Sequence, residues 1–333
     1  MKLVTFNTEI RSLLGAVVDD VIMDIQAAHT IARYERKEGD DLLPNDIIDF
    51  LLLGDEAIEV TNRVVEWYRE QGKPLVSHHT QVGYKMDEVS IVAPVPFPTS
   101  MRDAYAFRQH VEAARRNRGV EMIKEFDDFP VFYFTNHNAV TGPGEVLIRE
   151  NHLEKLDFEL EAAIVIGKEG RDIKASEADE YIFGYTIMND WSARALQMQE
   201  MKLNLGPAKG KDFATSIGPW LVTKDELADK RIAGDSGERF DLGMKAFVNG
   251  KEVSSGNMKD MTWTFAQILE RASYGVTLYP GEVIGSGTVG TGCFLELNGS
   301  KVFDPPWWLK DGDTVELEIE RLGKLTNTLQ LVR

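Results

Sequence analysis

Short apolar runs bounded by Gly, Pro and Asp recur along most of the chain, and they indicate its fold class. Beyond residue 99 they occur at 129–134, 144–148, 161–167, 181–188, 219–223, 245–250, 282–287, 293–297, 314–320 and 328–332. Patterns with a helical period are fewer and fall at 103–119, 177–182, 191–203 and 262–273. Many short strands with few helices predict a β-rich α+β fold.

The N-terminal part of the chain has a different pattern. It combines short strand-like runs at 2–6, 14–20 and 21–25 with helix-like segments at 46–53 and 56–72. Pro94, Pro96 and Pro98 then alternate, and neither a central strand nor a helix interior accommodates prolines at that spacing. We therefore predict two domains, a small α+β unit over residues 1–94 and a larger one over 95–333.

Composition narrows the classes of protein to consider. The net charge of −17 disfavours binding to nucleic acid or to an anionic membrane. No run reaches the ~18 apolar residues of a membrane span, and the N-terminus lacks the basic-then-apolar order of a signal peptide. The single cysteine, Cys293, excludes an internal disulfide and favours a cytoplasmic location.

The strand predicted around residues 156–166, LDFELEAAIVI, begins with two carboxylates on one face. Glu159 and Glu161 are two residues apart, so their side chains point the same way. Ala163 and Val165 continue that face, which makes the later part apolar on both sides, as in a central, covered strand. The two acids either lie in solvent or lie at a buried mouth where a cation compensates them. Periodicity alone leaves both alternatives open.

Asp190 ends the apolar run 181–188 and precedes a helix-like segment. It is either the N-cap of that helix or a third acid near the same sheet edge. Three carboxylates without a neighbouring histidine or cysteine would select a hard cation, Mg²⁺, Ca²⁺ or Mn²⁺.

Five spaced segments together resemble the fumarylacetoacetase family: RDAYAFRQH, DFELEAAIVIGKEGRDI, FGYTIMNDWSAR, LGPAKGKDFATSIGPWLV and GSGTVG. The resemblance covers about residue 95 to the C-terminus and leans towards fumarylacetoacetases proper. It implies a mixed β-sandwich roll with the site at its open end, usually in a homodimer, and a role in aromatic catabolism such as tyrosine degradation.

The resemblance also implies roles for individual residues. By motif position, the metal ligands are Asp103, Glu159, Glu161 and Asp190, with Lys211 and Thr215 beside the metal. His110 falls at the general base. The positions implied to contact substrate are Tyr105, Arg118, Tyr133, Gln197 and Thr288.

The reaction implied is hydrolysis of a carbon–carbon bond in a β-diketo acid, fumarylacetoacetate or an acylpyruvate. A divalent metal, Mg²⁺ or Ca²⁺ with Mn²⁺ as a further candidate, and Lys211 would stabilise the enolate that leaves, and His110 would activate water. The alternatives are a decarboxylase, hydratase, dehydratase or isomerase of 2-oxo acids that uses the same metal enolate, or a catalytically silent metal-binding homologue.

Two further expectations concern the segment around residues 285–297. GSGTVG fits G-x-G-x-x-G, but TGCFLEL after it looks like a strand, whereas a dinucleotide site requires a helix there. We expect a loop over the metal site instead. The family's glutamate-bearing segment, which orients the catalytic histidine, has no counterpart in this interpretation. His110 is therefore expected to be oriented by another acid, such as Glu112 or Glu121, or by none.

Overall fold

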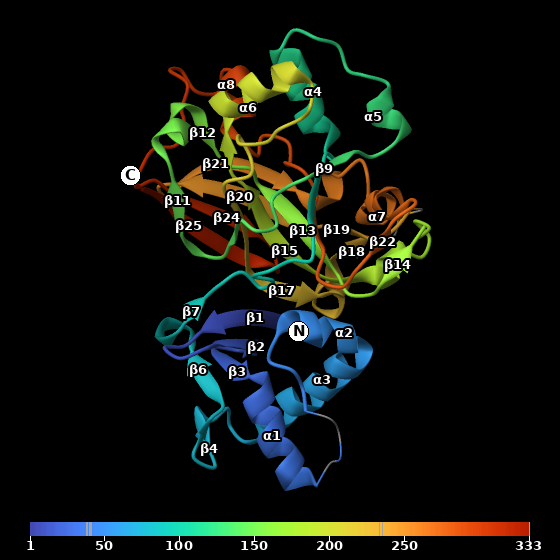
Figure 1. The fold of residues 1–333 in the computed structure, drawn as a ribbon, viewed down its shortest axis with the longest axis vertical. Helices are drawn as coiled ribbons and strands as arrows, with labels where there is room; N and C mark the ends of the chain where they lie inside the picture. The colour runs from blue at the N-terminus through green and yellow to red at the C-terminus, as the bar shows by residue number, and fades with distance from the viewer. Residues whose placement is uncertain (38, 40–41, 233, 235, 333) are drawn as a thin grey trace.

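The structure is a computed structural model that describes residues 1–37, 39, 42–232, 234 and 236–332. It is a sheet-rich α+β fold, as the apolar runs predicted. Figure 1 shows β1–β3 and α1–α3 grouped at one end of the molecule, with helices α4–α8 and the strands of the second sheet at the other end.

The larger sheet of the described chain has twelve strands and runs through the whole molecule. Antiparallel pairing of β1 with β17 joins the N-terminal strands to the rest, and the domain boundary at residues 94/95 stays a prediction. The strands in order are β6 (Gly83–Lys85), β3 (Val21–Asp24), β2 (Ser12–Val18), β1 (Lys2–Asn7), β17 (Thr215–Thr223), β15 (Ile182–Asp190), β13 (Glu161–Ile166), β23 (Val283–Gly285), β8 (Met101–Ala104) and β9 (Phe132–Phe134), with β10 (Val140–Thr141) beside β17 and β7 (Ser90–Ile91) beside β1.

A second sheet packs against the C-terminal half of the first and encloses the main apolar core. Its strand β24 alternates as its sequence predicts: Val315, Leu317 and Ile319 are buried, while Glu316 and Glu318 are only partly covered. The strands in order are β11 (Gly144–Ile148), β25 (Gly323–Leu331), β24 (Thr314–Ile319), β20 (Gly243–Val248) and β21 (Lys251–Asn257).

Helices and short strand pairs complete the described fold. The α-helices are α1 (Ile25–Arg36), α2 (Ile47–Leu53), α3 (Asp55–Glu70), α4 (Arg108–Asn117), α5 (Glu125–Asp128), α6 (Arg194–Glu200), α7 (Phe265–Ser273) and α8 (Phe294–Gly299). The 3₁₀ helices are η1 (Met86–Glu88), η2 (Glu150–Lys155), η3 (Ala178–Tyr181), η4 (Met201–Leu203), η5 (Lys224–Lys230) and η6 (Met258–Asp260). The short pairs are β4 (Val76–Ser77) with β5 (Thr80–Gln81), β12 (Leu156–Asp157) with β16 (Ser192–Ala193), β14 (Gly170–Arg171) with β22 (Thr277–Leu278), and β18 (Arg231–Ile232) with β19 (Arg239–Phe240).

The segment 293–297, expected to be a strand, is the start of helix α8. Cys293 is extended and serves as the N-cap residue without a capping side chain of its own. The carboxylate of Asp157 takes over that task, since it accepts from the backbone N–H groups of Phe294 (2.7 Å) and Leu295 (2.9 Å). Phe294 packs edge-on against Phe158, with ring centroids 5.1 Å apart. Distant residues therefore decide the local structure here.

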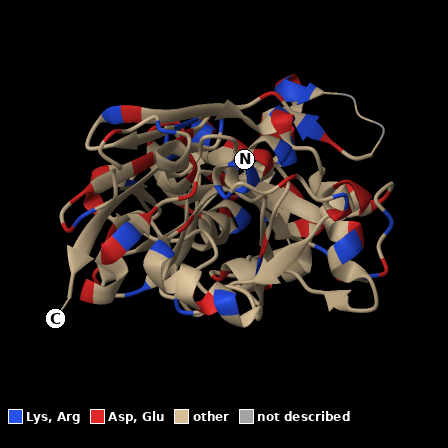
Figure 2. Cartoon of the chain, turned by 90° about the horizontal axis from the view of Figure 1, so that it is seen from above, with Lys and Arg blue, Asp and Glu red and all other residues tan. Residues whose placement is uncertain are grey.

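Charge is distributed over the whole chain. Figure 2 shows acidic and basic residues interspersed along the ribbon, so the net excess of acid is not confined to one element. Among the described residues, no helix combines the length and apolarity needed to cross a membrane.

Candidate active site

Four buried acids lie at the ends of neighbouring strands of the larger sheet. Asp103 is on β8, Glu161 begins β13, Glu159 immediately precedes it, and Asp190 ends β15. One carboxylate oxygen from each of Asp103, Glu159 and Glu161 lies within 4.8 Å of the others. Exposure is 5% or less for all four, which rules out a solvated face. Asp190 is not a helix cap either, because α6 begins at Arg194 after Ala193.

Strand β8 contributes Asp103 to this group of acids because the backbone of its neighbour β23 lies very close to the Asp103 side chain. Strand β23 separates β8 from β13, and its residue Gly285 is paired with Asp103 on one side and Ala163 on the other. A Cβ atom at Gly285 would lie 2.6 Å from Oδ1 of Asp103. Glycine is therefore required for Asp103 to reach the glutamates.

Cations and a hydroxyl compensate the charge of Glu159 and Asp190. Lys211 donates from Nζ to Oε2 of Glu159 and, at 2.9 Å, to Oδ2 of Asp190, which also accepts from the Tyr133 hydroxyl. Arg194 donates from Nη2 to Oε1 of Glu159 at 2.8 Å. Burial alone would raise the pKa of Glu159, but Lys211 and Arg194 hold that pKa below its ordinary value. Burial likewise opposes a charged Lys211, yet Asp190 and Glu159 raise its pKa, so the ammonium stays charged.

Asp103 and Glu161 have no such compensation. Within the described parts of the chain, no Lys or Arg forms an ion pair with either carboxylate. Asp103 accepts from the backbone N–H of Gly287 at 3.1 Å, and the Thr288 hydroxyl lies 3.4 Å from Oε1 of Glu161. Burial and the charge of Asp190 raise the pKa of Asp103 to about 8, and burial and Asp103 raise the pKa of Glu161 well above its ordinary value.

The arrangement fits a hard divalent cation. Oε2 of Glu161 and Oδ1 of Asp190 are buried and have no hydrogen-bond partner among the described residues. A buried carboxylate oxygen without a partner is costly unless a cation or proton compensates it. The donors are all carboxylate oxygens, the set that Mg²⁺, Ca²⁺ and Mn²⁺ prefer.

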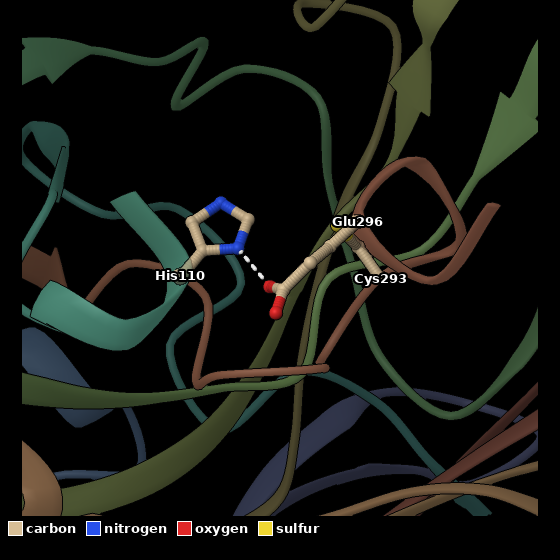
Figure 3. Close-up of side chains that lie close together, drawn as sticks. All are labelled: His110, Cys293 and Glu296. Carbon is tan, nitrogen blue, oxygen red and sulfur yellow. Dashed lines mark hydrogen bonds and ion pairs between the residues drawn. The ribbon is translucent and has the colours of Figure 1, made fainter. Parts of the chain in front are cut away.

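A histidine–glutamate pair forms the second part of the site. Nδ1 of His110, on α4, lies 2.6 Å from Oε2 of Glu296, on α8, and Figure 3 shows the imidazole directed at that carboxylate. Oε1 of Glu296 accepts from the backbone N–H of Thr291 at 2.9 Å. Since both oxygens act as acceptors, we assign the proton of the neutral imidazole to Nδ1, which leaves Nε2 as the basic nitrogen.

The expected partners of His110 were wrong. Glu112 pairs instead with Arg108 at 2.6 Å on the helix surface, and the backbone carbonyl of Glu121 accepts from Arg115. Glu296 was overlooked because its segment was interpreted as a strand. In the six-residue helix α8, Glu296 lies one turn after Cys293 and faces α4.

The remaining candidate residues divide into those near the site and one at the surface. The ring of Tyr105 meets His110 edge-on at 5.7 Å, and burial raises the pKa of its phenol to about 12. Oε1 of Gln197 accepts from Nη1 of Arg194 at 3.0 Å, and buried Thr215 pairs with Asp190 in the sheet. Arg118 is exposed at the end of α4, where its Nε donates to the Ala114 carbonyl, and its contact with substrate stays a prediction.

Two buried residues were missed in the sequence although both lie inside quoted motifs. Arg194 ends NDWSAR and donates from Nε to Oδ2 of Asp157 at 2.9 Å, in addition to its bond to Glu159. Because Asp157 also caps α8, the carboxylate cage and the His110–Glu296 pair are connected through these two side chains. The available signal for Arg194 was its place in NDWSAR, four residues after the candidate ligand Asp190.

Comparison with curated proteins finds relatives over the whole chain. The oxaloacetate tautomerase YisK of Bacillus subtilis is 31% identical over 335 residues, covering 99% of this chain and 100% of the relative. The mitochondrial oxaloacetate tautomerase Fahd2a of Rattus norvegicus is 32% identical over 292 residues, covering 86% of this chain and 80% of the relative.

Solved structures share the fold along their full length. A fumarylacetoacetate hydrolase from Exiguobacterium antarcticum superposes with a TM-score of 0.71 at 25% identity, with full coverage of both chains. A maleylpyruvate hydrolase from Sphingobium, described in complex with manganese(II) and pyruvate, gives a TM-score of 0.67 at 20% identity, again with full coverage. Residues 99–330 match the model of the fumarylacetoacetate (FAA) hydrolase C-terminal family, and the chain belongs to that family.

Proposed function

We propose that this protein is a metal-dependent tautomerase that interconverts the keto and enol forms of a 2-oxo dicarboxylate of the oxaloacetate kind. The observation that carries the proposal is the buried His110–Glu296 pair, a base with an assigned proton position, joined to the four carboxylates through Arg194 and Asp157. Arg194 donates to Glu159 and to Asp157, and Asp157 caps α8, the helix that carries Glu296.

The residues supply the parts that such a reaction requires. Nε2 of His110 takes a proton from the carbon next to the ketone. The electrons of that C–H bond form the carbon–carbon double bond, and the carbonyl π electrons move to oxygen. The imidazolium, stabilised by Glu296, then returns the proton to that oxygen to give the enol. The reverse sequence gives the ketone, and no water is consumed.

Lys211 has an electrostatic part in this reaction. Its raised pKa keeps it charged, so it stabilises the negative charge that develops on the substrate oxygen but does not act as a base. Asp103, Glu159, Glu161 and Asp190 would hold a divalent cation, and such a cation, when bound, supplies Lewis-acid polarisation of a 2-oxo acid. The manganese described in the maleylpyruvate hydrolase supports Mn²⁺ as a candidate beside Mg²⁺ and Ca²⁺.

The full-length similarity to oxaloacetate tautomerases favours tautomerisation over bond cleavage. Hydrolysis of a carbon–carbon bond in a diketo acid is the second candidate. It is supported by the likeness to a fumarylacetoacetate hydrolase and by a base that could equally activate water. The relatives named here give no support to a role in tyrosine degradation.

The test is a direct comparison of the two reactions with the purified protein and Mn²⁺ or Mg²⁺. Enol oxaloacetate is followed by the decay of its ultraviolet absorbance, and acylpyruvate cleavage is followed by pyruvate release. We expect rapid enol decay, and the variants His110→Ala and Glu296→Gln to lower it, by ~10²–10⁴-fold for His110→Ala. His78→Ala is the matched control, because His78 is a surface histidine paired with Glu35.

The two candidates give opposite outcomes in that comparison. Cleavage of an acylpyruvate at a far higher rate than enol decay would establish the hydrolase instead. Release of CO₂ from oxaloacetate as the dominant reaction would replace both with a decarboxylase.

A further inference from the structure

We propose that His110, Cys293 and Glu296 form a second metal site, separate from the carboxylate cage, that binds a thiophilic divalent cation such as Zn²⁺ and thereby inhibits the protein. One ligand atom from each residue lies within 4.8 Å of the other two, and all three residues are buried. Figure 3 shows the imidazole and the carboxylate directed at one another, with Cys293 adjacent.

The placement of the three residues follows from how α4 and α8 pack. Cys293 is the N-cap residue of α8, and Glu296 follows one turn later, so both side chains face the same neighbour. That neighbour is α4, which contributes His110. Asp157 fixes the start of α8 by accepting from two backbone N–H groups. The position of Cys293 and Glu296 relative to His110 is therefore held by the fold.

The donor chemistry separates this group from the cage. Imidazole nitrogen, thiolate sulfur and a carboxylate oxygen are ligands that Zn²⁺ takes, with a fourth position left for water. Mg²⁺ and Ca²⁺ prefer oxygen ligands alone, which the cage offers and this group does not. Ligand bonds of ~2.0–2.3 Å place ligand atoms ~3–4 Å apart, so Nδ1 of His110 and Oε2 of Glu296, which lie 2.6 Å apart, open slightly around the ion.

Binding of the ion changes the proton positions in a definite way. The Cys293 thiol gives up its proton to solvent when the ion binds, because the thiolate is the ligand. Nδ1 of His110, which faces Glu296, becomes the metal ligand, and the imidazole proton moves to Nε2. An imidazole bound through Nδ1 with a proton on Nε2 has no lone pair left to accept a substrate proton. Inhibition therefore rests on the proposed role of His110 as base, whereas ion binding does not.

The site is tested by Co²⁺ absorption, with Co²⁺ as a spectroscopic substitute for Zn²⁺. Cys293 is the single cysteine of the chain, so any thiolate-to-cobalt charge-transfer band must arise from it. The protein is first saturated with Mg²⁺ to fill the cage, and thiol reductants are removed. We expect a near-ultraviolet band in the wild type that Zn²⁺ or a chelator abolishes. Absence of the band after prolonged incubation would overturn the proposal.

Variants then connect the ion to activity. Cys293→Ser and Cys293→Ala should lack the band and keep enol decay near the wild-type rate, because the thiol has no part in the proposed reaction. Half-inhibition of these variants should need at least about tenfold more Zn²⁺ than the wild type needs. Inhibition of wild type and both variants at the same Zn²⁺ concentration would show that the inhibiting ion binds elsewhere and would overturn inhibition through this site.

The two proposals fail separately in this design. A cobalt band without zinc inhibition would leave the site in place and contradict the role of His110 as base. If the Cys293 variants do not fold, displacement of Co²⁺ by Zn²⁺ in the wild type gives the decision. A cobalt band that excess Zn²⁺ leaves unchanged would count against a zinc site.

Discussion

The two halves of the carboxylate cage differ in how their charge is balanced. The compensated half, Glu159 and Asp190, is bonded to Lys211, with Arg194 on Glu159 and Tyr133 on Asp190. The uncompensated half, Asp103 and Glu161, receives a backbone N–H and a distant hydroxyl. The protein thus neutralises the compensated half with its own cations, and the uncompensated half depends on an added cation or on a proton.

This asymmetry assigns different roles to the two halves: the compensated half braces the site, and the uncompensated half requires a metal. The ion pairs of Glu159 brace the site and hold Lys211 in place. The cluster needs a metal because of the oxygens of Asp103 and Glu161. Burying a carboxylate without a partner costs free energy, and a bound cation offsets that cost.

The largest expected effect is on the free energy of unfolding of the metal-free protein. Glu159→Gln should lower this free energy, whereas Glu161→Gln should not. Glu159→Gln breaks buried pairs with Lys211 and Arg194 and should lower the free energy of unfolding by ~3–5 kcal/mol. Glu161→Gln removes a buried carboxyl whose ionisation burial and Asp103 oppose, and it should leave this free energy equal or higher. Urea denaturation at pH 8 with a chelator measures both, and equal destabilisation would contradict the asymmetry.

The next effect concerns Lys211 and catalysis. Lys211→Met removes the cation proposed to stabilise the developing negative charge, and turnover should fall by ~10²–10³-fold. Mn²⁺ affinity should not fall, because the acids keep their charge and lose a competing cation. Lys209→Met is the matched control, since Lys209 is exposed, lies two residues before Lys211 and pairs with Asp212. Turnover that survives in Lys211→Met would remove the lysine from the mechanism.

Removal of the metal should lower the free energy of unfolding of the wild type by a smaller amount than Glu159→Gln does. A ligand that binds only the folded state adds ~2.7 kcal/mol to the free energy of unfolding when present at 100 times its Kd. Wild type should gain about this much from Mn²⁺, measured by the shift of the urea midpoint against a chelated sample. Glu161→Gln should gain little, because its metal affinity should be lower by ~100-fold or more. Equal gains in both proteins would show that the ion binds elsewhere.

Glu159, Glu161 and Asp190 were within reach of sequence reasoning because the segments that carry them have strand patterns, whereas Asp103 was named only by the family resemblance and lay in a segment predicted to be helical. A strand alternates strictly, so the shared face of Glu159 and Glu161 followed from their spacing, and Asp190 followed from the end of an apolar run. Their burial and their cationic partners did not follow, since a solvated face and a metal cage both fitted the same pattern. The contacts that decide, from Lys211 and Arg194, come from other segments.

Glu296 shows where local reasoning ended. The run CFLEL alternates like a strand, and nothing near it in sequence signals a helix. The capping carboxylate comes from Asp157, 137 residues earlier, and the packing partner Phe158 follows it. Tertiary contacts here override local propensity, so the partner of His110 became visible only in the fold.

The smallest expected effect concerns Asp24, a buried acid outside the cage. It tests whether burial raises the pKa of Asp24 as it does for Asp103 and Glu161. Asp24 is buried at the start of α1, where Oδ1 accepts from the Ala27 N–H at 2.9 Å and Oδ2 has no partner in the described chain. Burial raises its pKa, so its protonated form stabilises the fold below the unfolded pKa and that stability is lost as pH rises through the folded pKa. Asp24→Asn keeps a capping oxygen and carries no charge.

Asp24→Asn should therefore be more stable than the wild type at pH 8, by about 1 kcal/mol or less, and the difference should shrink towards pH 4. Asp24→Ala, which loses the cap, should be less stable than Asp24→Asn by ~1 kcal/mol at both pH values. Urea denaturation with saturating Mn²⁺ at pH 8, and its repetition at pH 4, isolates this residue from the cage at the upper pH. A difference between wild type and Asp24→Asn that does not change with pH would mean that Asp24 keeps its charge in the fold at no cost. Burial alone would then not explain the raised pKa values of Asp103 and Glu161, and the mutual repulsion of the two carboxylates would have to account for them.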